Sequence, residues 1–320
     1  MAPRVAVLGA SGFGRFHARW YAALGCQVVA FLGSSPESVQ RTAATLRDEF
    51  GLEPRGYCDL DQLLSSERPD AVSVATPPPL HARHTLAALE AGCSVLCEKP
   101  FVWDPAASRQ EMLAAASKVV EAARARGLVL SVNTQYAAAA ELYRQLVPPE
   151  VLREPRRFTA EMTSLLRPKS PSGPGIVADL LPHPLSELLA LLPGAELVEG
   201  SVDVGVGRRG SEVAFEVRLG ERRCEVNVRV AKLPAEPFPR RFGLDGLMAD
   251  CQSAPDRDGL YRGRLRLGER EVVCDDFMKI SLERFVKAVG GQGEPLVDTA
   301  AAVKNLAMML AVLEAAGATR

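Results

Sequence analysis

The sequence predicts an α/β fold with two domains: a doubly wound parallel sheet in residues 1–133, and an α+β domain built on a large, mostly antiparallel sheet in residues 134–320. Three observations predict it. A chain of 320 residues is long enough for two hydrophobic cores. In the first part, short apolar runs alternate with segments of helical character, as in repeated β-α-β units. In the second part, strand-like segments follow one another with few helices between them, and many alternate apolar and polar residues.

The first part contains five apolar runs, which we expect to be strands buried on both faces of a parallel sheet. They are Val5–Leu8, Val28–Leu32, Ala71–Ala75, Ser94–Cys97 and Val129–Val132. Four segments between them are rich in helix formers or amphipathic, and are expected to be helices. They are Phe13–Leu24, Pro36–Phe50, Leu80–Ala91 and Pro105–Arg126.

The second part begins with a helix, Ala138–Leu146, which ends before Pro148-Pro149. Six strands are expected after it: Arg157–Met162, Ser201–Val206, Val213–Leu219, Cys224–Val230, Leu260–Leu267 and Glu271–Cys274. One helix interrupts them, Gly175–Leu192, and two follow, Phe277–Val289 and Thr299–Ala315. Alternation along the strands indicates that one face of this sheet is covered and the other is exposed.

Composition argues against several classes of protein. The chain has 38 lysines and arginines against 39 aspartates and glutamates, whereas binding nucleic-acid phosphates requires a clear basic excess. No apolar run approaches the ~20 residues that a membrane span needs. The N-terminus runs directly into the first strand and shows no secretory signal. We therefore expect a cytoplasmic protein without nucleic-acid or membrane partners.

Neither the cysteines nor the histidines predict a metal site. The seven cysteines include no Cys-x-x-Cys pair, and in a reducing compartment they are expected to be packing residues. His81 and His84 are three residues apart, but no acid or cysteine accompanies them in the pattern of a metal site.

A glycine-rich segment joins the first strand to the first helix: Gly9, Ala10, Ser11, Gly12, Phe13 and Gly14. A dinucleotide needs a tight turn, a bare backbone near its pyrophosphate and a helix N-terminus directed at its charge. Gly9 and Gly14 fit the first and last positions of G-x-G-x-x-G, and Ser11 takes the middle one. We predict that these six residues bind the cofactor of a Rossmann domain, with a plain glycine turn as the alternative.

The end of the second strand bears on the choice between NAD and NADP. An NAD enzyme usually has an Asp or Glu there to bind the ribose 2′-hydroxyl. This chain has Ser34 and Ser35 and no acid at that point. The two hydroxyls would donate hydrogen bonds to a 2′-phosphate, while Arg41 lies nearly two turns into the next helix. The sequence therefore favours NADP over NAD, and Ser34 and Ser35 are predicted cofactor contacts.

Three further segments complete the pattern. They are Thr76-Pro77-Pro78-Pro79-Leu80-His81, Glu98-Lys99-Pro100 and Asp179-Leu180-Leu181-Pro182-His183. Together with the glycine-rich segment, they resemble the Gfo/Idh/MocA family (glucose–fructose oxidoreductase, inositol dehydrogenase and relatives). The resemblance covers nearly the whole chain. It implies an NAD(P)-dependent oxidoreductase that transfers a hydride to or from a carbon bearing a hydroxyl or carbonyl group.

The resemblance implies that Lys99, Asp179 and His183 are catalytic. Lys99 follows a strand's carboxyl end and is suited to stabilising negative charge on the reacting oxygen; a solvated loop lysine is the alternative. Asp179 and His183 are four residues apart and would share a helix face; Pro182 between them removes a helical hydrogen bond, so it is expected within the first turns of the helix or at a kink. His183 would exchange a proton, and Asp179 would orient it or bind substrate hydroxyls. The alternative for this pair is a buried histidine whose partner is a nearby carboxylate.

The resemblance also implies the surroundings of the nicotinamide. Thr76, Pro77 and His81 would line its pocket, and Glu98 would orient Lys99 or contact the nicotinamide ribose. The family's usual substrates are sugars, cyclitols and related polyols or their ketones, and its members commonly form dimers or tetramers. We therefore expect a small-molecule substrate of this class, a homodimer or homotetramer, and no metal, since hydride transfer with this cofactor needs none.

Substrate contacts are less sharply indicated. The candidates are Asn133, Gln135, Tyr136 and Lys169, each of which could equally be a surface or linker residue. Arg262, Arg264 and Arg266 alternate along one strand, and a solvated outer face or a subunit contact fits them better than an anion site.

Two other functions stay open. One is a glycoside hydrolase that keeps NAD tightly bound and oxidises its sugar only transiently. The other is a non-catalytic NAD(P)-sensing regulator on the same scaffold, although a sensor has no reason to retain Lys99, Asp179 and His183 together.

Overall fold

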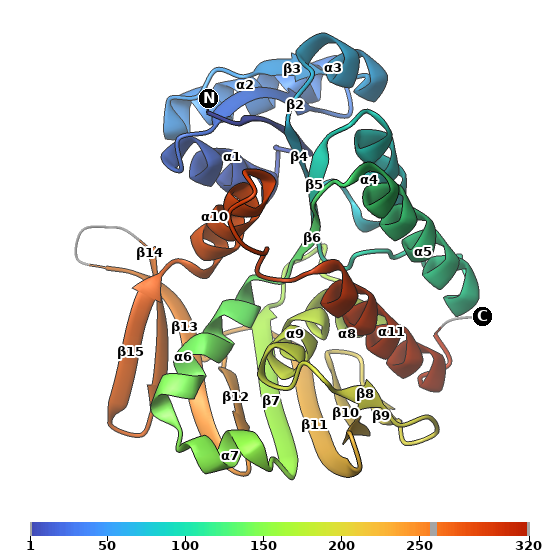
Figure 1. The fold of residues 1–320 in the computed structure, drawn as a ribbon, viewed down its shortest axis with the longest axis vertical. Coiled ribbons are helices and arrows are strands. Elements are labelled where there is room, and N and C mark those ends of the chain that lie inside the picture. Colours follow the sequence, from blue (N-terminus) through green and yellow to red (C-terminus); the bar gives the residue numbers. More distant parts are fainter. Residues whose placement is uncertain (1, 257–260, 319–320) are drawn as a thin grey trace. The chain divides into compact units, whose positions relative to one another are not determined.

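The computed structural model describes residues 2–256 and 261–318. The chain forms two compact units, each containing one sheet (Figure 1). The first unit consists of Met1–Asp104, Glu111–Asn133 and Met278–Ala302. The second consists of Pro105–Gln110, Thr134–Phe277 and Val303–Arg320.

The first unit contains a six-stranded sheet in the order β3-β2-β1-β4-β5-β6, with every neighbouring pair parallel. Its strands are β1 (Arg4–Leu8), β2 (Gln27–Leu32), β3 (Arg55–Tyr57), β4 (Ala71–Val74), β5 (Ser94–Glu98) and β6 (Leu130–Asn133). The strand order reverses between β1 and β4. Ligands of doubly wound folds bind at such a point, beyond the carboxyl ends of the strands. The predicted parallel α/β fold is confirmed.

The helices of this unit include one from the far end of the chain. They are α1 (Gly14–Ala23), α2 (Pro36–Phe50), α3 (Leu60–Glu67), α4 (His81–Glu90), most of α5 (Arg109–Arg126) and nearly all of α10 (Phe277–Val289). Leu282 and Phe285 of α10 are fully buried in the same hydrophobic cluster as Val7 and Phe31. The core of the first unit therefore includes a segment that follows the second unit's sheet in the sequence.

Two elements of the first unit, β3 and α3, have no counterpart among the predicted ones. β3 has only three residues and lacks an apolar run. α3 begins after Asp59, whose side chain accepts a hydrogen bond from the backbone N–H of Gln62 at 2.8 Å, as an N-cap does. The predicted helix from Pro105 starts instead at Arg109.

The second unit contains a nine-stranded, mostly antiparallel sheet, as predicted. Its order is β15-β14-β13-β12-β7-β11-β10-β8, with β9 paired to β10, and only β7 and β11 are parallel. The strands are β7 (Arg157–Leu165), β8 (Glu196–Leu197), β9 (Asp203–Val206), β10 (Gly210–Leu219), β11 (Arg222–Leu233), β12 (Arg240–Leu244), β13 (Leu247–Pro255), β14 (Tyr261–Leu267) and β15 (Arg270–Asp275). Leu260, predicted as the start of a strand, lies outside the described residues.

Helices pack on one face of this sheet, with α6 (Ala139–Leu146), α8 (Pro174–Leu180) and α9 (Pro182–Leu191) in contact with its strands. The unit also contains η2 (Gln135–Ala138), α7 (Pro149–Arg153) and most of α11 (Thr299–Ala315). Figure 1 shows α6, α8 and α9 crossing the strands. Alternate strand residues such as Phe158 and Val226 are buried, and the intervening positions are largely charged. The expected covered and exposed faces are therefore both present.

The hairpin of β12 and β13 was missing from the predicted elements. Its turn is Asp245-Gly246, and both residues have positive φ angles, 49° and 86°. Asp-Gly is a sequence typical of a two-residue hairpin turn between strands. A signal for this hairpin was thus present in the sequence, but the arginines at the start of β12 interrupt its apolar pattern.

The predicted helix Gly175–Leu192 is wrong as a single element, because the structure divides it into α8 and α9. Pro182 has no N–H and cannot continue the hydrogen-bonding pattern of α8. It instead occupies the first turn of α9, where a missing N–H costs nothing. Among residues 2–256 and 261–318, no helix has both the length and the apolar character needed to cross a bilayer.

Candidate active site

The glycine-rich segment lies at the carboxyl edge of the first unit's sheet, directly against the end of β4. A Cβ atom on Gly9, whose φ is +89°, would lie 2.6 Å from the carbonyl oxygen of Ala75. A Cβ atom on Gly14 would lie 2.6 Å from the carbonyl oxygen of Gly9. These two positions therefore require glycine, whereas a Cβ atom on Gly12 would meet open space.

The start of α1 is suited to an anion. Its N-cap residue, Phe13, makes no side-chain hydrogen bond to the first turn, and no acid lies in that turn. Backbone N–H groups at a helix start attract negative charge. Ala10 is buried, while Ser11, Gly12 and Phe13 are exposed around this helix start. The bare backbone and the uncapped helix start fit a dinucleotide pyrophosphate.

Ser34 and Ser35 follow β2, but their hydroxyls are not equivalent. Ser34 is exposed, whereas Ser35 is the N-cap of α2 and accepts a hydrogen bond from the backbone N–H of Ser38 at 3.2 Å. The Glu37 carboxyl group accepts a hydrogen bond from the Ser35 side chain and another from its own backbone N–H. Both hydrogen bonds lower the pKa of this carboxyl group. An ionised carboxylate therefore lies beside Ser35, where the sequence predicts a 2′-phosphate.

Glu98, the last residue of β5, is the centre of a buried polar cluster. Its Oε1 atom lies 2.9 Å from Nε2 of His17 and accepts a hydrogen bond from the Asn133 side chain at 2.5 Å. The other ring nitrogen of His17 lies 2.7 Å from Oγ of Ser73. His17 is fully buried, so α1, β4, β5 and β6 are joined by side chains below the sheet edge.

This cluster keeps Glu98 ionised and ties it to Lys99. Burial acts to raise the pKa of Glu98, but the hydrogen bond and charge of His17, the Asn133 amide and the charge of Lys99 together lower it. Oε2 of Glu98 accepts a hydrogen bond from the backbone N–H of Lys99 at 3.3 Å. Glu98 thus holds the backbone of the predicted catalytic lysine, and the Lys99–Pro100 peptide bond that follows is cis.

His81 connects two loops at the same sheet edge. Its Nε2 atom lies 2.8 Å from the carbonyl oxygen of Thr76, and its Nδ1 atom lies 2.8 Å from that of Pro100. The side chain of Thr76 is in turn 3.1 Å from Nδ1 of His84. The structure thus brings the loop after β4, which holds Thr76 and Pro77, next to the turn that holds Lys99. His81 is only 1% exposed, so its own ring is covered.

In the second unit, Asp179 and His183 occupy consecutive helices, on either side of the break at Pro182. Both are partly accessible, in contrast to the buried residues around them. Asp179 forms an ion pair with Lys232 of β11, with Oδ2 2.6 Å from Nζ. The ring of His183 meets that of Tyr136 edge-on at 5.0 Å, and the hydroxyl of Tyr136 accepts a hydrogen bond from Arg240 at 2.7 Å.

Known proteins share this architecture. Residues 3–134 match the family model GFO_IDH_MocA, described as an oxidoreductase family with an NAD-binding Rossmann fold. A 1,5-anhydro-D-fructose reductase from Ensifer adhaerens is 28% identical to the chain over 92% of this chain and 90% of its own length. The structure of UDP-N-acetylglucosamine 3-dehydrogenase from Acidithiobacillus ferrooxidans matches with a TM-score of 0.76 and 25% identity, over 98% of both chains.

The matched family model and these relatives support a Gfo/Idh/MocA oxidoreductase. The crystal structure of an inositol dehydrogenase homologue from Azotobacter vinelandii, complexed with NADH and myo-inositol, matches 99% of this chain and 96% of its own at 20% identity, with a TM-score of 0.75. That likeness concerns the fold. It extends through both units, so the second sheet, like the first, has the architecture found among these proteins.

The remaining candidate residues of the sequence analysis lie in different surroundings. Asn133 belongs to the Glu98 cluster, Tyr136 packs on His183, and Lys169 is exposed in the loop before α8. Gln135 is half-buried in η2. Within the described residues, no group of three or more His, Cys, Asp or Glu side chains is arranged to hold a metal ion.

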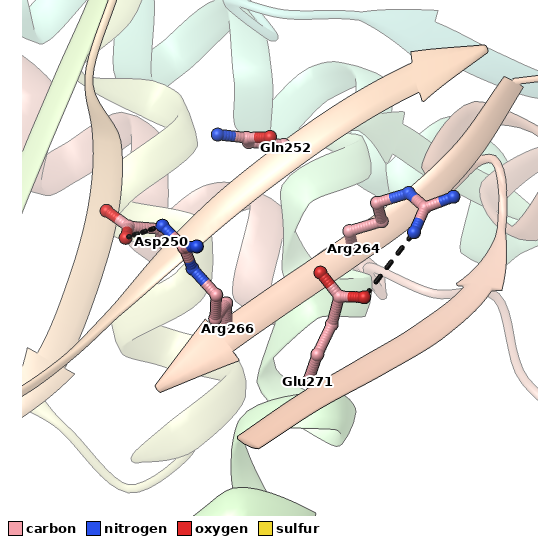
Figure 2. Close-up of a pocket in the computed structure, with 5 residues that line it drawn as sticks. All are labelled: Asp250, Gln252, Arg264, Arg266 and Glu271. Carbon is pink, nitrogen blue, oxygen red and sulfur yellow. Dashed lines mark hydrogen bonds and ion pairs between the residues drawn. The ribbon is translucent and has the colours of Figure 1, made fainter. Parts of the chain in front are cut away.

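The three alternating arginines of β14 lie on the exposed face of the second sheet, and each is paired with acids. Arg262 pairs with Asp275, Arg264 with Glu271 and Asp256, and Arg266 with Asp250. Figure 2 shows a hollow on this face that is lined by Asp250, Gln252, Arg264, Arg266 and Glu271. With its charges balanced, this hollow does not favour an anion, in agreement with the interpretation of these arginines as a solvated face or subunit contact.

Sequence reasoning missed His17, Ser73 and Lys232. His17 lies in the helix after the glycines, but its partner Glu98 is 81 residues away along the chain. Lys232 lies in a strand whose alternate residues are otherwise apolar. A lysine at an inward-facing position of a strand is the one signal that could have drawn attention to it.

Proposed function

We propose that this oxidoreductase interconverts a hydroxyl and a carbonyl group on a sugar, cyclitol or related polyol, with Lys99, Asp179 and His183 as its catalytic residues. Residues 1–133 would bind the cofactor, and residues 134–320 would bind the substrate. The relatives named above act on, or are bound to, molecules of this class. The observation that carries the proposal is the Glu98–Lys99 turn, which a buried cluster ties to α1, the helix that follows the glycine-rich segment.

The cofactor would be held by Gly9 to Gly14 at its pyrophosphate, and by Thr76, Pro77 and Glu98 near the nicotinamide. When bound, nicotinamide accepts a hydride from an alcohol carbon or donates one to a carbonyl carbon. In the oxidation direction, His183 removes the proton of the substrate hydroxyl. Lys99 stabilises the developing negative charge on that oxygen. Asp179, held by Lys232, orients the imidazole or binds a neighbouring hydroxyl group.

A substrate screen tests this function directly. Sugars, cyclitols and their keto forms are incubated with NAD(P)+ or NAD(P)H, and the absorbance of the reduced cofactor is followed. We expect stoichiometric change of the cofactor with at least one polyol, and loss of it in the Lys99→Ala and His183→Ala variants. Full activity in both variants would refute the assigned roles. Cofactor that copurifies and never turns over would point to the NAD-dependent hydrolase.

We infer a preference for NADP from the serines after β2, with the Glu37 carboxylate acting against it. Dissociation constants for NADPH and NADH decide the matter, and at least about tenfold tighter binding of NADH would overturn the preference. Glu37→Gln sharpens the test. Removing that charge should tighten NADPH binding and leave NADH binding nearly unchanged.

We also propose that the protein is a homodimer or homotetramer in the cytoplasm. The exposed face of the second sheet carries acids and arginines in alternation, so two copies of it would present complementary charges to each other. Light scattering at physiological and high salt gives the mass of the particle. A monomer at micromolar concentration would contradict the oligomer.

A further inference from the structure

We propose that His81 is a buried imidazolium ion that fastens the loop after β4 to the turn after β5 and so positions Lys99. The consequence for catalysis rests on the proposed function, because it assumes that these loops hold the nicotinamide and the reacting oxygen. The charge on His81 does not rest on it. This role replaces the direct cofactor contact that the sequence predicts for His81.

The charge follows from the two hydrogen-bond partners. Both ring nitrogens of His81 lie 2.8 Å from backbone carbonyl oxygens, one from Thr76 and one from Pro100. A carbonyl oxygen accepts hydrogen bonds and cannot donate them. A neutral imidazole donates from one nitrogen only, so its other nitrogen would face a carbonyl lone pair. Both contacts are hydrogen bonds only if the ring carries two protons.

The surroundings can support this charge. Burial by itself lowers the pKa of His81, but the neighbouring Cys97 and the carbonyl groups of Pro100 and Thr76 outweigh it and raise the pKa to about 9. Among the described residues, no carboxylate forms an ion pair with His81. The other charged or titratable groups near His81 include His84 and Arg83 on its own helix, with Arg83 acting on His84, and Lys99, which directly precedes Pro100 in the turn after β5.

His84 offers a contrast within the same helix. It lies one turn after His81, is also buried, and contacts the Thr76 hydroxyl, which can either donate or accept a hydrogen bond. Burial, Arg83 and His81 lower the pKa of His84. Two histidines three residues apart are thus in opposite protonation states at neutral pH, because one faces two carbonyl groups and the other a hydroxyl.

The position of His81 shows what its charge can do for the site. Thr76 begins the loop expected beside the nicotinamide, and Pro100 directly follows Lys99. The Glu98 cluster holds the backbone N–H of Lys99 from one side, and His81 holds the carbonyl of Pro100 from the other. The turn is thereby fixed at both ends. His81 is a positioning residue, since it acts on the reaction through this turn.

The charge can be observed without cofactor. Long-range ¹H–¹⁵N spectra of the whole, unliganded protein report the protonation of each imidazole nitrogen, and the chain has only 4 histidines. The His81→Gln variant assigns the His81 signals, and His84→Gln those of its neighbour. We expect both nitrogens of His81 to stay protonated through neutral pH, and the ring to lose one proton near pH 9. One bare nitrogen at pH 7 would overturn the proposal.

Kinetics test the positioning role. We expect His81→Gln to lower kcat about tenfold, because it removes the charged hydrogen bonds that hold the turn, while KM for the polyol stays within about twofold. The wild type should lose kcat above pH 9, and His81→Gln should lack this alkaline decline. His84→Gln, the matched control, should retain it. An unchanged alkaline decline in His81→Gln would contradict the positioning role.

His81→Leu, which has no donor, should be more impaired than His81→Gln; if it fails to fold, the wild-type spectra still decide the charge. The two proposals fail separately. A wild type that turns over no polyol would defeat the proposed function and leave the spectra unaffected. A neutral His81 in an active enzyme would defeat only the present inference.

Discussion

The candidate residues of the two units are held in different ways. In the first unit, Glu98 and His81 are buried, and their polar atoms contact partners from α1, β6 and the loops after β4 and β5. In the second, the side chain of Asp179 is 30% exposed, and an ion pair joins it to Lys232. Fixed polar groups are typical of a prepared cofactor site, and accessible ones of groups that meet substrate. Substitutions should therefore cost stability in the first unit and mainly activity in the second.

Lys99 should depart from this comparison most strongly, because it lies at the edge of the buried Glu98 cluster but is proposed to act on the substrate. Lys99→Ala is expected to lower kcat by about 100- to 1000-fold, as removal of one oxyanion-stabilising donor does. Steady-state kinetics measure the loss, and fluorescence titration should give nearly the same Kd for the cofactor. Lys118→Ala, on the exposed surface of α5, is the control. A decrease of kcat smaller than about tenfold would exclude Lys99 from the reaction.

His17→Leu should destabilise the protein by about 3 kcal/mol, because it leaves the Glu98 carboxylate buried without its main partner. Urea unfolding at pH 7 measures the loss. Without His17 the pKa of Glu98 should rise. Glu98→Gln removes the charge, so the double variant should lose less stability than the sum of the two single losses. Strict additivity would mean that the two side chains do not interact.

The pH dependence of the free energy of unfolding tests whether His81 is charged. Its folded pKa of about 9 lies above the ordinary 6.5, so its contribution is fully present below pH 6.5 and is lost as the pH rises through 9. The difference corresponds to at most about 3 kcal/mol. We expect the free energy of unfolding of the wild type to fall over this range and that of His81→Gln to stay flatter. Parallel curves for the two proteins would rule out the charged state.

Lys232→Met tests the second unit. The variant keeps the length of the buried side chain and removes only the ion pair with Asp179, so kcat should fall about tenfold with little loss of stability, since the carboxylate is partly solvated. Kinetics and thermal unfolding are measured on the same samples. A large drop in Tm with normal kcat would instead assign the pair a purely structural role.

The smallest effect is expected on the exposed sheet face. Arg266 is 60% exposed and pairs with Asp250, and such surface pairs contribute less than about 1 kcal/mol. Arg266→Ser should therefore leave urea unfolding of the protein nearly unchanged. A larger loss, appearing together with a smaller particle mass in light scattering, would show that this face is buried between copies.

The sequence was informative where one segment contains the whole signal. Continuous apolar runs predicted the parallel strands, and alternation predicted an exposed sheet. It failed where the signal is short or interrupted: β3 has three residues, β12 opens with two arginines, and Pro182 divides a helix whose composition is otherwise uniform.

The candidate site shows the same contrast between residues that lie in local motifs and residues that contact them from distant parts of the sequence. Motifs predicted Lys99, Asp179 and His183 as catalytic residues, but they did not predict the side chains that contact Glu98 and Asp179. His17 reaches Glu98 across 81 residues of sequence. Lys232 forms an ion pair with Asp179 from a strand that no recognisable motif marks. Such contacts depend on which strands become neighbours, and no local pattern contains that information.

The return of residues 278–302 to the first unit has a consequence for how the chain matures. A ribosome that has synthesised only the first sheet has not yet supplied Leu282 and Phe285, which complete its hydrophobic cluster. An apolar surface of the first unit therefore stays exposed while the intervening part of the chain is translated. Chaperones that recognise such surfaces would have their longest opportunity during that interval, and a gene fragment that stops after residue 133 would prolong it indefinitely.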